Sequence, residues 1–173
     1  MTAFPVKQPE AGTSSGRLPQ GGQQIAVTLL ARRDYSQEEM ARKLAARGIP
    51  GEEIERILQT LQDQKLLDDH RYARRWASFW IQGKWLGPLR IKMRLLQKGI
   101  SEAIVRETLM YTEEIFPAKE RLRKILASER KQKENGPIPL HRKKKLVNLL
   151  RQKGYGWEDI SEVLEESGGF AEE

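Results

Sequence analysis

The side chains of this sequence best suited to chemistry are arginines and lysines. In two places they recur at intervals of three or four residues, which puts them on one face of a helix, and in a third place four of them are consecutive. A guanidinium donates hydrogen bonds in a rigid fork that matches phosphate and carboxylate groups. We therefore predict a surface that binds a polyanionic or acidic partner. The candidate contact residues are Arg71, Arg74, Arg75, Arg90, Arg94, Lys98, Arg142, Lys143, Lys144, Lys145, Arg151 and Lys153.

Residues for catalysis or metal binding do not gather at any recognised spacing. His70 and His141 are the two histidines, and the chain has no cysteine to act as a nucleophile or a zinc ligand. Asp68 and Asp69 stand beside His70, but acidic side chains at the start of a helix are explained by capping. We therefore expect a protein that is not an enzyme and holds neither a metal nor a cofactor.

Charge is distributed unevenly along the chain. The net charge is +7, yet residues 117–153 carry thirteen basic and three acidic side chains, hence +10. Residues 154–173 carry seven acidic side chains and no base, hence −7. The basic segment is expected to attract polyanions, of which nucleic acid is the most common. The acidic segment either balances these bases within the protein or meets a basic surface on a partner, and the sequence leaves both alternatives open.

One pattern occurs three times in the chain. It reads KLAARGIPGEEIERIL at residues 43–58, RLLQKGISEAIVRETL at 94–109 and LLRQKGYGWEDISEVL at 149–164. The aligned glycines Gly48, Gly99 and Gly154 are 51 and 55 residues apart, and each follows a leucine by four positions. Recurrence at such a period is typical of stacked supersecondary units, which present an extended binding surface.

Helical periodicity dominates the chain from Ile25 onward, and no segment shows the alternation of a strand. The pattern Ser36-x-x-Glu39 is a capping box, which predicts the start of a helix. Gly48 suits the left-handed residue that ends this helix. We assign to the core an aromatic stripe at helical spacing, which consists of Tyr72, Trp76, Phe79 and Trp80.

The predicted fold class is all-α, with three tandem three-helix repeats in an elongated array. The repeats are placed at residues 24–67, 68–116 and 117–166, followed by a C-terminal tail at 167–173. Residues 1–23 are rich in Gly, Pro, Ser and Gln, and cannot bury enough apolar surface to offset the entropy of ordering. We therefore predict a disordered N-terminal tail.

Membrane and export signals are not recognised in the sequence. No stretch approaches the ~18 apolar residues of a membrane span. Residues 1–23 lack the continuous apolar core of a signal peptide. We therefore expect a cytoplasmic protein without a membrane partner.

The order and spacing of four motifs resemble the RecX family, the bacterial regulators of the RecA recombinase. These motifs are KLAARGI, LLDDHRYARRW, LGPLRIKMRLLQKGI and LRQKGYGWEDISEVL. The resemblance covers about residues 24–166. Its most specific parts are Leu67-Asp68-Asp69-x-Arg71-Tyr72-Ala73 and Gly87-Pro88 leading to Lys98-Gly99-Ile100. The segment Lys84-Trp85-Leu86 departs from the pattern, because a shorter polar link is more usual there.

The resemblance implies a modulator of RecA. Proteins of this family consist of three tandem three-helix repeats in a curved, elongated body, and they bind the RecA filament on single-stranded DNA along its helical groove. They suppress strand exchange, ATP hydrolysis and the co-protease activity that triggers the SOS response. The implied partners are RecA and the RecA–single-stranded DNA filament. We expect a monomer, and any direct binding to single- or double-stranded DNA is expected to be weak.

The alternative function is a direct DNA-binding protein that uses a basic helix-turn-helix-like array against phosphates. It requires tight binding to naked DNA at physiological salt. For each basic face, the alternative to partner contact is a solubilising surface with exposed ion pairs, each worth roughly 0–1 kcal/mol. Residues 142–145 favour contact, because these four consecutive bases have few acids nearby.

Overall fold

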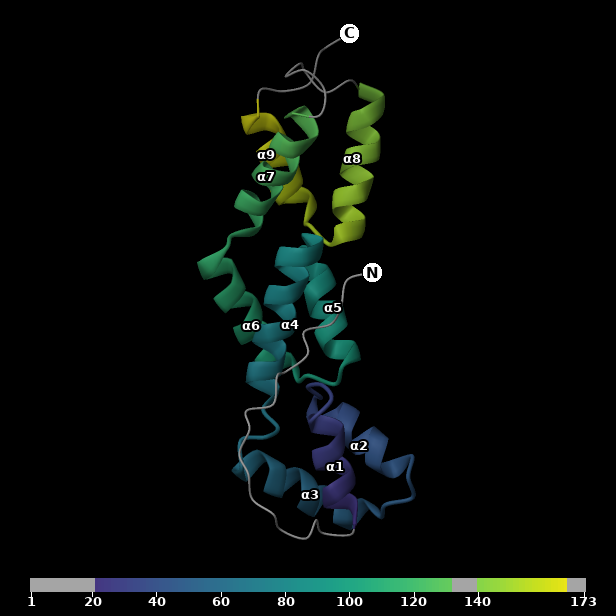
Figure 1. Cartoon of the computed structure of the whole chain (residues 1–173). Coiled ribbons are helices and arrows are strands. Elements are labelled where there is room, and N and C mark those ends of the chain that lie inside the picture. The colour runs from purple at the N-terminus through teal and green to yellow at the C-terminus, as the bar shows by residue number, and fades with distance from the viewer. Residues whose placement is uncertain (1–20, 132–139, 168–173) are drawn as a thin grey trace. The chain divides into compact units, whose positions relative to one another are not determined.

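The computed structural model describes residues 21–131 and 140–167, and every regular element in these ranges is an α-helix (Figure 1). The all-α prediction is confirmed. The helices are α1 (Gly22–Leu30), α2 (Gln37–Ala45), α3 (Gly51–Asp63), α4 (Asp69–Lys84), α5 (Pro88–Gln97), α6 (Glu102–Ile115), α7 (Ala118–Lys131), α8 (Leu140–Lys153) and α9 (Trp157–Glu166). None of them is long and apolar enough to cross a membrane, within the part of the chain that is described.

Residue contacts group the chain into two compact units. The first extends to Tyr72 and includes Lys98–Ser101, and the second comprises Ala73–Gln97 and the chain from Glu102 onward. In the first unit, α1, α2 and α3 enclose a core that includes Met40, Leu44 and Leu61. In the second unit, α7, α8 and α9 enclose another core. The predicted aromatic stripe on α4 is buried in part: Trp80 is buried, whereas Trp76 and Phe79 are half-buried.

Three sequence expectations fall on residues beyond the described ranges. The tail predicted at residues 1–23 lies outside them except for its last three residues, and α1 already begins at Gly22. The loop predicted at Asn135-Gly136-Pro137 lies outside them, and so does the C-terminal tail after Ser167.

Two neighbouring acids cap two different helices. The Asp68 carboxylate accepts a hydrogen bond from the Arg71 N–H at 2.9 Å, at the start of α4. Asp69 is buried and accepts from the Gln37 N–H at 2.9 Å, in the first turn of α2. First-turn N–H groups have no acceptor within their own helix, so both carboxylates satisfy donors that would otherwise be unpaired. The described residues contain no cluster of three or more side chains that could hold a metal ion.

The capping box and the glycine turn of the first repeat form as the sequence predicts. The Ser36 hydroxyl accepts from the Glu39 N–H at 3.1 Å, and the Ser36 N–H donates to the Glu39 carboxylate at 3.4 Å. After α2 the Ile49 N–H donates back to the Leu44 carbonyl at 3.4 Å. This bond is part of a Schellman motif, in which the residue before Ile49 adopts the left-handed conformation.

All three aligned glycines adopt that left-handed conformation. The φ angles are 78° at Gly48, 77° at Gly99 and 92° at Gly154. The leucine four positions before each glycine has no exposed surface, which holds for Leu44, Leu95 and Leu150 alike. The repeat seen in the sequence is therefore a repeat of backbone conformation and of core position.

Two of these glycine turns pack against the first turn of another helix. A Cβ atom at Gly99 would lie 2.2 Å from the Glu38 Cβ in α2, and one at Gly154 would lie 2.4 Å from the Arg90 backbone nitrogen in α5. A Cβ atom at Gly48 would meet nothing within 4 Å. Glycine at positions 99 and 154 therefore provides space as well as a left-handed backbone, whereas at position 48 it provides the backbone alone.

Hydrogen bonds join each packed turn to the helix that it meets. In the second unit, the Gly87 N–H donates to the Lys153 carbonyl at 2.8 Å, and the Leu89 N–H donates to the Gly154 carbonyl at 3.1 Å. The end of α8 thereby supplies acceptors to the start of α5, and Figure 1 shows these two helix ends meeting. In the first unit, the Ser36 hydroxyl that caps α2 donates to the Lys98 carbonyl.

A cluster around the Glu39 carboxylate reinforces the Gly99 turn. The Tyr72 hydroxyl donates to one carboxylate oxygen at 2.8 Å, and the Lys98 ammonium donates to the other at 2.7 Å. The Arg33 guanidinium lies 3.4 Å from the first oxygen. Burial alone would raise the pKa of Glu39, but the hydrogen bonds from Lys98 and Tyr72 and the charge of Arg33 outweigh it, so the pKa is lowered.

The atypical link Lys84-Trp85-Leu86 is held by buried polar groups of the second unit. Trp85 has a φ of 54°, and its carbonyl accepts from the Tyr155 hydroxyl at 3.1 Å. The Leu86 carbonyl accepts from the Arg121 guanidinium at 2.9 Å. Burial raises the pKa of Tyr155 to about 12, against the opposing charge of Arg121.

Arg121 is a buried cation with incomplete hydrogen bonding. Its side chain has no exposed surface, and one terminal nitrogen makes no hydrogen bond to the described residues. That nitrogen lies 3.5 Å from the Glu113 carboxylate, an ion pair without hydrogen-bond geometry. Burial lowers the pKa of Arg121, and the nearby Tyr155 and Glu113 oppose this shift.

Alanine substitution of the three glycines should separate backbone strain from packing. Gly48→Ala is expected to destabilise the protein by about 1 kcal/mol, since only a left-handed alanine is introduced. Gly99→Ala and Gly154→Ala add a steric overlap and are expected to cost about 2–4 kcal/mol. Urea unfolding followed by circular dichroism measures the loss of stability in each variant. Equal losses of stability at the three positions would contradict the packing argument.

Removing the Glu39 charge should make stability less dependent on pH. Its folded pKa is lowered, so the carboxylate stabilises the fold above the unfolded value of about 4.3, and this contribution is lost as pH falls through the lower folded pKa. Glu39→Gln is expected to cost about 1–3 kcal/mol at pH 7 and almost nothing well below pH ~4.

The control for this substitution is Glu38→Gln, at an exposed neighbour whose carboxylate lies 3.4 Å from Arg42. It is expected to cost less than about 0.5 kcal/mol at either pH. Urea titrations at several pH values between 7 and 3 give the comparison. If Glu39→Gln lost the same free energy of unfolding at every pH in this range, the charge would not be what stabilises the turn.

Candidate functional site

The first group of predicted contact residues lies on α4, and each of its members has a contact within the protein. The Arg71 guanidinium donates to the Lys65 carbonyl at 2.9 Å. The Arg74 guanidinium lies over the Tyr111 ring, 4.9 Å from its centroid. Arg75 is half-buried and also interacts with other residues of the chain. Arg71 and Arg74 remain exposed, so their outer edges are still accessible to a partner.

The second group divides into three different environments. Arg90 is exposed, although its backbone packs against the Gly154 turn. Arg94 is half-buried, with its guanidinium 5.3 Å from the centroid of the Trp80 ring. Lys98 donates to the Glu39 carboxylate, as described above. The spacing of four predicted one outer stripe, but of these three bases Arg90 is exposed, whereas Arg94 and Lys98 are half-buried.

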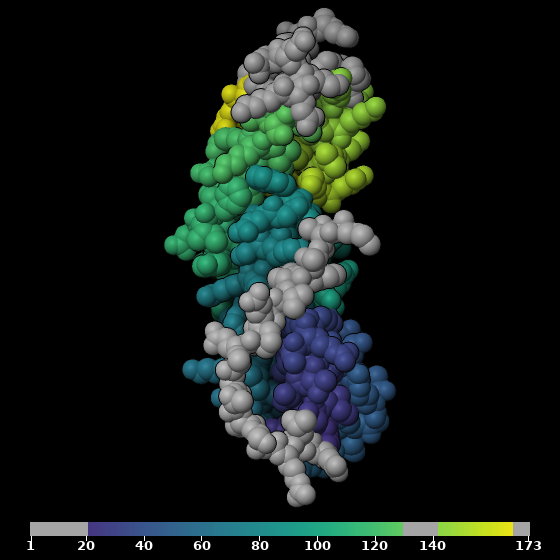
Figure 2. Space-filling model, in the orientation of Figure 1, coloured from purple at the N-terminus to yellow at the C-terminus, as the bar shows by residue number. Residues whose placement is uncertain are grey.

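The third group lies on α8. Lys144, Lys145 and Arg151 are exposed, whereas Arg142 and Lys143 are half-buried, and Lys143 has an interaction within the chain. The remaining member, Lys153, is half-buried. In the space-filling view, side chains of α8 project from the surface of the second unit (Figure 2).

Lys153 belongs to a structural pattern that the repeat itself contains. Its ammonium donates to the Lys84 carbonyl at 2.7 Å, beside the Gly154 turn. The equivalent Arg47 donates to the Lys43 carbonyl at 2.8 Å, and the equivalent Lys98 bonds to Glu39. The base before each glycine is therefore bonded inside the protein. Its recurrence at the same place in all three repeats was the sequence signal for this role.

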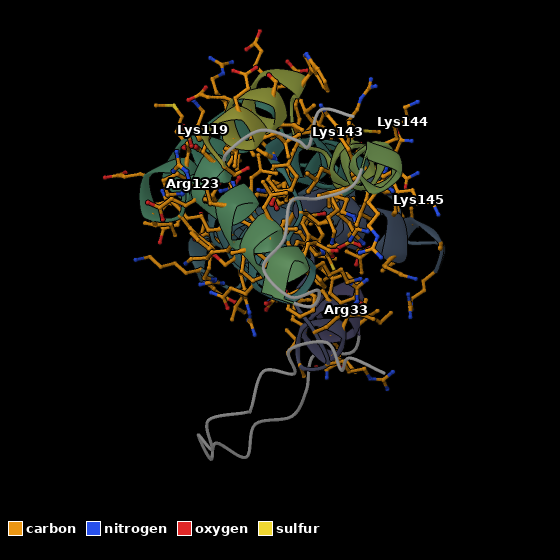
Figure 3. The ribbon with its side chains drawn as sticks, turned by 90° about the horizontal axis from the view of Figure 1, so that it is seen from above. Arg33, Lys119, Arg123, Lys143, Lys144 and Lys145 are labelled. Carbon is orange, nitrogen blue, oxygen red and sulfur yellow. The ribbon has the colours of Figure 1, made fainter. Side chains whose placement is uncertain are left out.

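Acidic residues of α9 pair with α7. Glu162 forms an ion pair with Lys119, and Glu166 accepts hydrogen bonds from the Arg123 guanidinium at 2.9 and 3.0 Å. In Figure 3, Lys119 and Arg123 lie on one side of the second unit, and Lys144 and Lys145 lie on the other. For these two acids the structure decides between the alternatives left open by the sequence: they balance bases within the protein, and those bases are on α7.

Four predicted residues are exposed and make no ion pair, side-chain hydrogen bond or ring contact with the described residues: Arg90, Lys144, Lys145 and Arg151. Lys144 and Arg151 are seven positions apart on α8, which puts them on the same face. Exposed ammonium and guanidinium groups can bind phosphates or carboxylates through charge-assisted hydrogen bonds. We therefore take these four residues, all in the second unit, as the candidate interaction surface.

Comparison with known proteins places these features in one family. The description "RecX, first three-helix domain" matches residues 24–61, and "RecX, second three-helix domain" matches residues 68–109. The first range contains α2 and most of α1 and α3, and the second contains α4 and α5 and ends inside α6.

Curated relatives extend the similarity over most of the chain. "Regulatory protein RecX" from Pelodictyon phaeoclathratiforme is 31% identical over 144 residues, which cover 83% of this chain and 87% of that protein. The protein of the same name from Chlorobaculum tepidum is 31% identical over 139 residues, covering 80% of this chain and 83% of that protein.

Solved structures agree in fold. The crystal structure of RecX from Lactobacillus salivarius superposes with a TM-score of 0.73 at 22% identity, covering 84% of this chain and 93% of that one. A second crystal structure, of a regulatory protein RecX, gives a TM-score of 0.67 at 26% identity, covering 83% of this chain and 70% of that one. Family match, sequence identity and fold lead to one conclusion: this chain belongs to the RecX family.

Proposed function

We propose that this protein is a negative regulator of RecA. In this proposal it binds the RecA–single-stranded DNA filament in its helical groove and inhibits ATP hydrolysis, strand exchange and co-protease activity. It acts as a monomer in the cytoplasm, without catalysing a reaction of its own. The observation that carries the proposal is membership in the RecX family, with relatives named regulatory proteins over more than 80% of the chain.

The distribution of exposed charge supports a partner that is acidic or polyanionic. The four residues of the candidate interaction surface are cations without ion-pair partners in the described ranges, and the chain as a whole carries +7. A nucleoprotein filament presents phosphates together with protein carboxylates. Electrostatic attraction of this kind increases the rate of encounter and weakens as salt is added.

A repeated helical scaffold supports binding across a surface. Three repeats built on the same glycine turn present successive helices to solvent, so contact can extend over several protomers of a regular partner. In the proposal, the protein bridges neighbouring RecA protomers along the groove. The other predicted bases on α4, α5 and α8 then contribute in addition to their contacts within the protein.

The first test is a titration of RecA ATPase activity on single-stranded DNA, with binding to naked DNA measured in the same buffer. We expect ATP hydrolysis to fall at protein concentrations at least about tenfold below those that coat naked DNA, because the filament offers contacts that DNA alone lacks. No inhibition at stoichiometric excess over RecA would contradict the proposal. Inhibition only where the DNA itself is coated would support the alternative, a basic helical protein that competes for the strand.

The second test uses matched pairs of lysine and arginine substitutions on opposite sides of the second unit. Lys144→Ala/Lys145→Ala removes two charges that have no ion-pair partner among residues 21–131 and 140–167, and Lys119→Ala/Arg123→Ala removes two charges already paired with Glu162 and Glu166. Both variants change the net charge equally. The first is expected to weaken filament binding several-fold and, if the contacts are phosphates, to reduce the slope of log K against log salt by about two.

The control variant is expected to keep wild-type filament binding and to lose less than about 1 kcal/mol of stability per ion pair. Fluorescence anisotropy of labelled DNA in the filament, measured at several salt concentrations, gives both slopes. Equal loss of binding in the two variants would mean that total charge alone, and no surface on α8, determines affinity.

A further inference from the structure

The second unit exposes three large apolar side chains around the Gly154 turn. Leu89 is 56% exposed, Met93 is 52% exposed and Trp157 is 59% exposed. The Leu89 N–H donates to the Gly154 carbonyl at 3.1 Å, and Trp157 begins α9 three residues after that glycine. Met93 follows Leu89 by one helical turn on α5, so the three side chains originate around one junction.

The repeats themselves show that the fold does not require apolar residues at these positions. Counted from the aligned glycines, each of the three positions has two counterparts in the other repeats, and all of the counterparts are charged, polar or glycine. Leu89 corresponds to Glu38 and Lys144, Met93 to Arg42 and Asn148, and Trp157 to Gly51 and Glu102. Helices of the same repeat therefore form with polar residues at these places. Packing within the protein does not explain why this junction is apolar.

Basic side chains border the apolar residues on α5. Successive residues of a helix are rotated by about 100°, which places Leu89 and Met93 between Lys92 on one side and Arg90 on the other. Both bases are exposed. Tryptophan, methionine and arginine are enriched at protein interfaces, and an exposed apolar group with a polar rim is the usual form of a binding site for another protein.

We propose that Leu89, Met93 and Trp157 form a docking surface for a protein partner whose contact region has apolar side chains and a rim of carboxylates. The inference rests on the proposed function, in which that partner is the RecA protomer of the filament. The apolar side chains supply affinity by burial, with Trp157 as the largest anchor. Arg90 and Lys92 supply charge complementarity and fix the orientation of the partner.

Two other occupants fit these observations less well. A second copy of this chain that docked through the same surface would bring Arg90 and Lys92 close to their own equivalents, and like charges at an interface are unfavourable. Proteins bind single-stranded nucleic acid through a positively charged groove and several aromatic side chains, on which successive nucleobases stack. Here Leu89 stands where the third repeat has Lys144, so a candidate phosphate contact is replaced by an apolar group.

The repeats supply the substitutions for the test. Leu89→Lys and Met93→Asn introduce the residues that the third repeat has at the same positions, and Trp157→Glu introduces the residue of the second repeat. The control is Met110→Asn, at a methionine of α6 that is 68% exposed and lies outside the docking surface. Thermal unfolding of each full-length variant verifies that the fold is retained.

Filament binding and naked single-stranded DNA binding are then measured for each variant. We expect Leu89→Lys/Met93→Asn and Trp157→Glu each to weaken binding to the RecA–single-stranded DNA filament at least about tenfold. The double variant should bind naked DNA as well as the wild type or better, because it gains a base. Met110→Asn should bind the filament like the wild type.

Each possible outcome decides between the hypotheses. Wild-type filament affinity in the folded docking-surface variants would overturn the docking surface and leave the proposed function intact. A parallel loss of naked DNA binding in the double variant would assign these residues to nucleic acid and would also overturn it. If the wild-type protein itself failed to bind the filament, the proposed function and this inference would both be wrong.

Discussion

The structure depends on a turn that ends a helix at a left-handed glycine, a residue that has no Cβ atom. At Gly99 and Gly154 the turn must satisfy two conditions, a φ near +80 to +90° and contact with a neighbouring helix start closer than any side chain permits. Only glycine meets both. The close approach in turn lets backbone carbonyls at the end of one helix reach donors at the start of another, as Lys153 and Gly154 do for α5. A single small residue therefore links the end of one helix to the capped start of a helix that comes earlier in the chain.

The polar groups around the two packed turns differ, although the backbone is the same. At the Gly99 turn, the half-buried Glu39 carboxylate accepts hydrogen bonds from Lys98 and Tyr72 and lies beside the Arg33 guanidinium, so that two cations face one anion. Near the Gly154 turn a fully buried Arg121 has incomplete hydrogen bonding and bonds mainly to a backbone carbonyl. A buried cation without full compensation costs free energy, which its bonds to the Leu86 and Pro117 carbonyls, its ion pair with Glu113 and its ring contacts with Phe116 and Tyr155 offset in part.

Local patterns made the helices, the capping box and the glycine turns predictable, because each depends on residues within a few positions of one another. The roles of individual basic residues were harder to predict from the sequence. Lys98 was expected on an outer stripe, but its partner Glu39 is 59 positions away in the sequence, and the Lys84 carbonyl that Lys153 meets is 69 positions away. The burial of Arg121 was not foreseen for the same reason. Periodicity shows which face a side chain occupies, whereas ion pairing and exposure depend on which distant segment that face meets.

The repeats share a backbone conformation but differ in the outer residues at equivalent positions. The position ten residues before each aligned glycine holds Glu38 in the first repeat, Leu89 in the second and Lys144 in the third: an acid, an apolar group and a base. Since each lies in the first turns of the second helix of its repeat, these residues change surface chemistry without changing the fold. A partner built from identical protomers offers the same groups at every step. Under the proposed function, the three repeats therefore cannot contact such a partner in the same way: the apolar Leu89 is stabilised by burial, whereas Glu38 and Lys144 pair with groups of opposite charge.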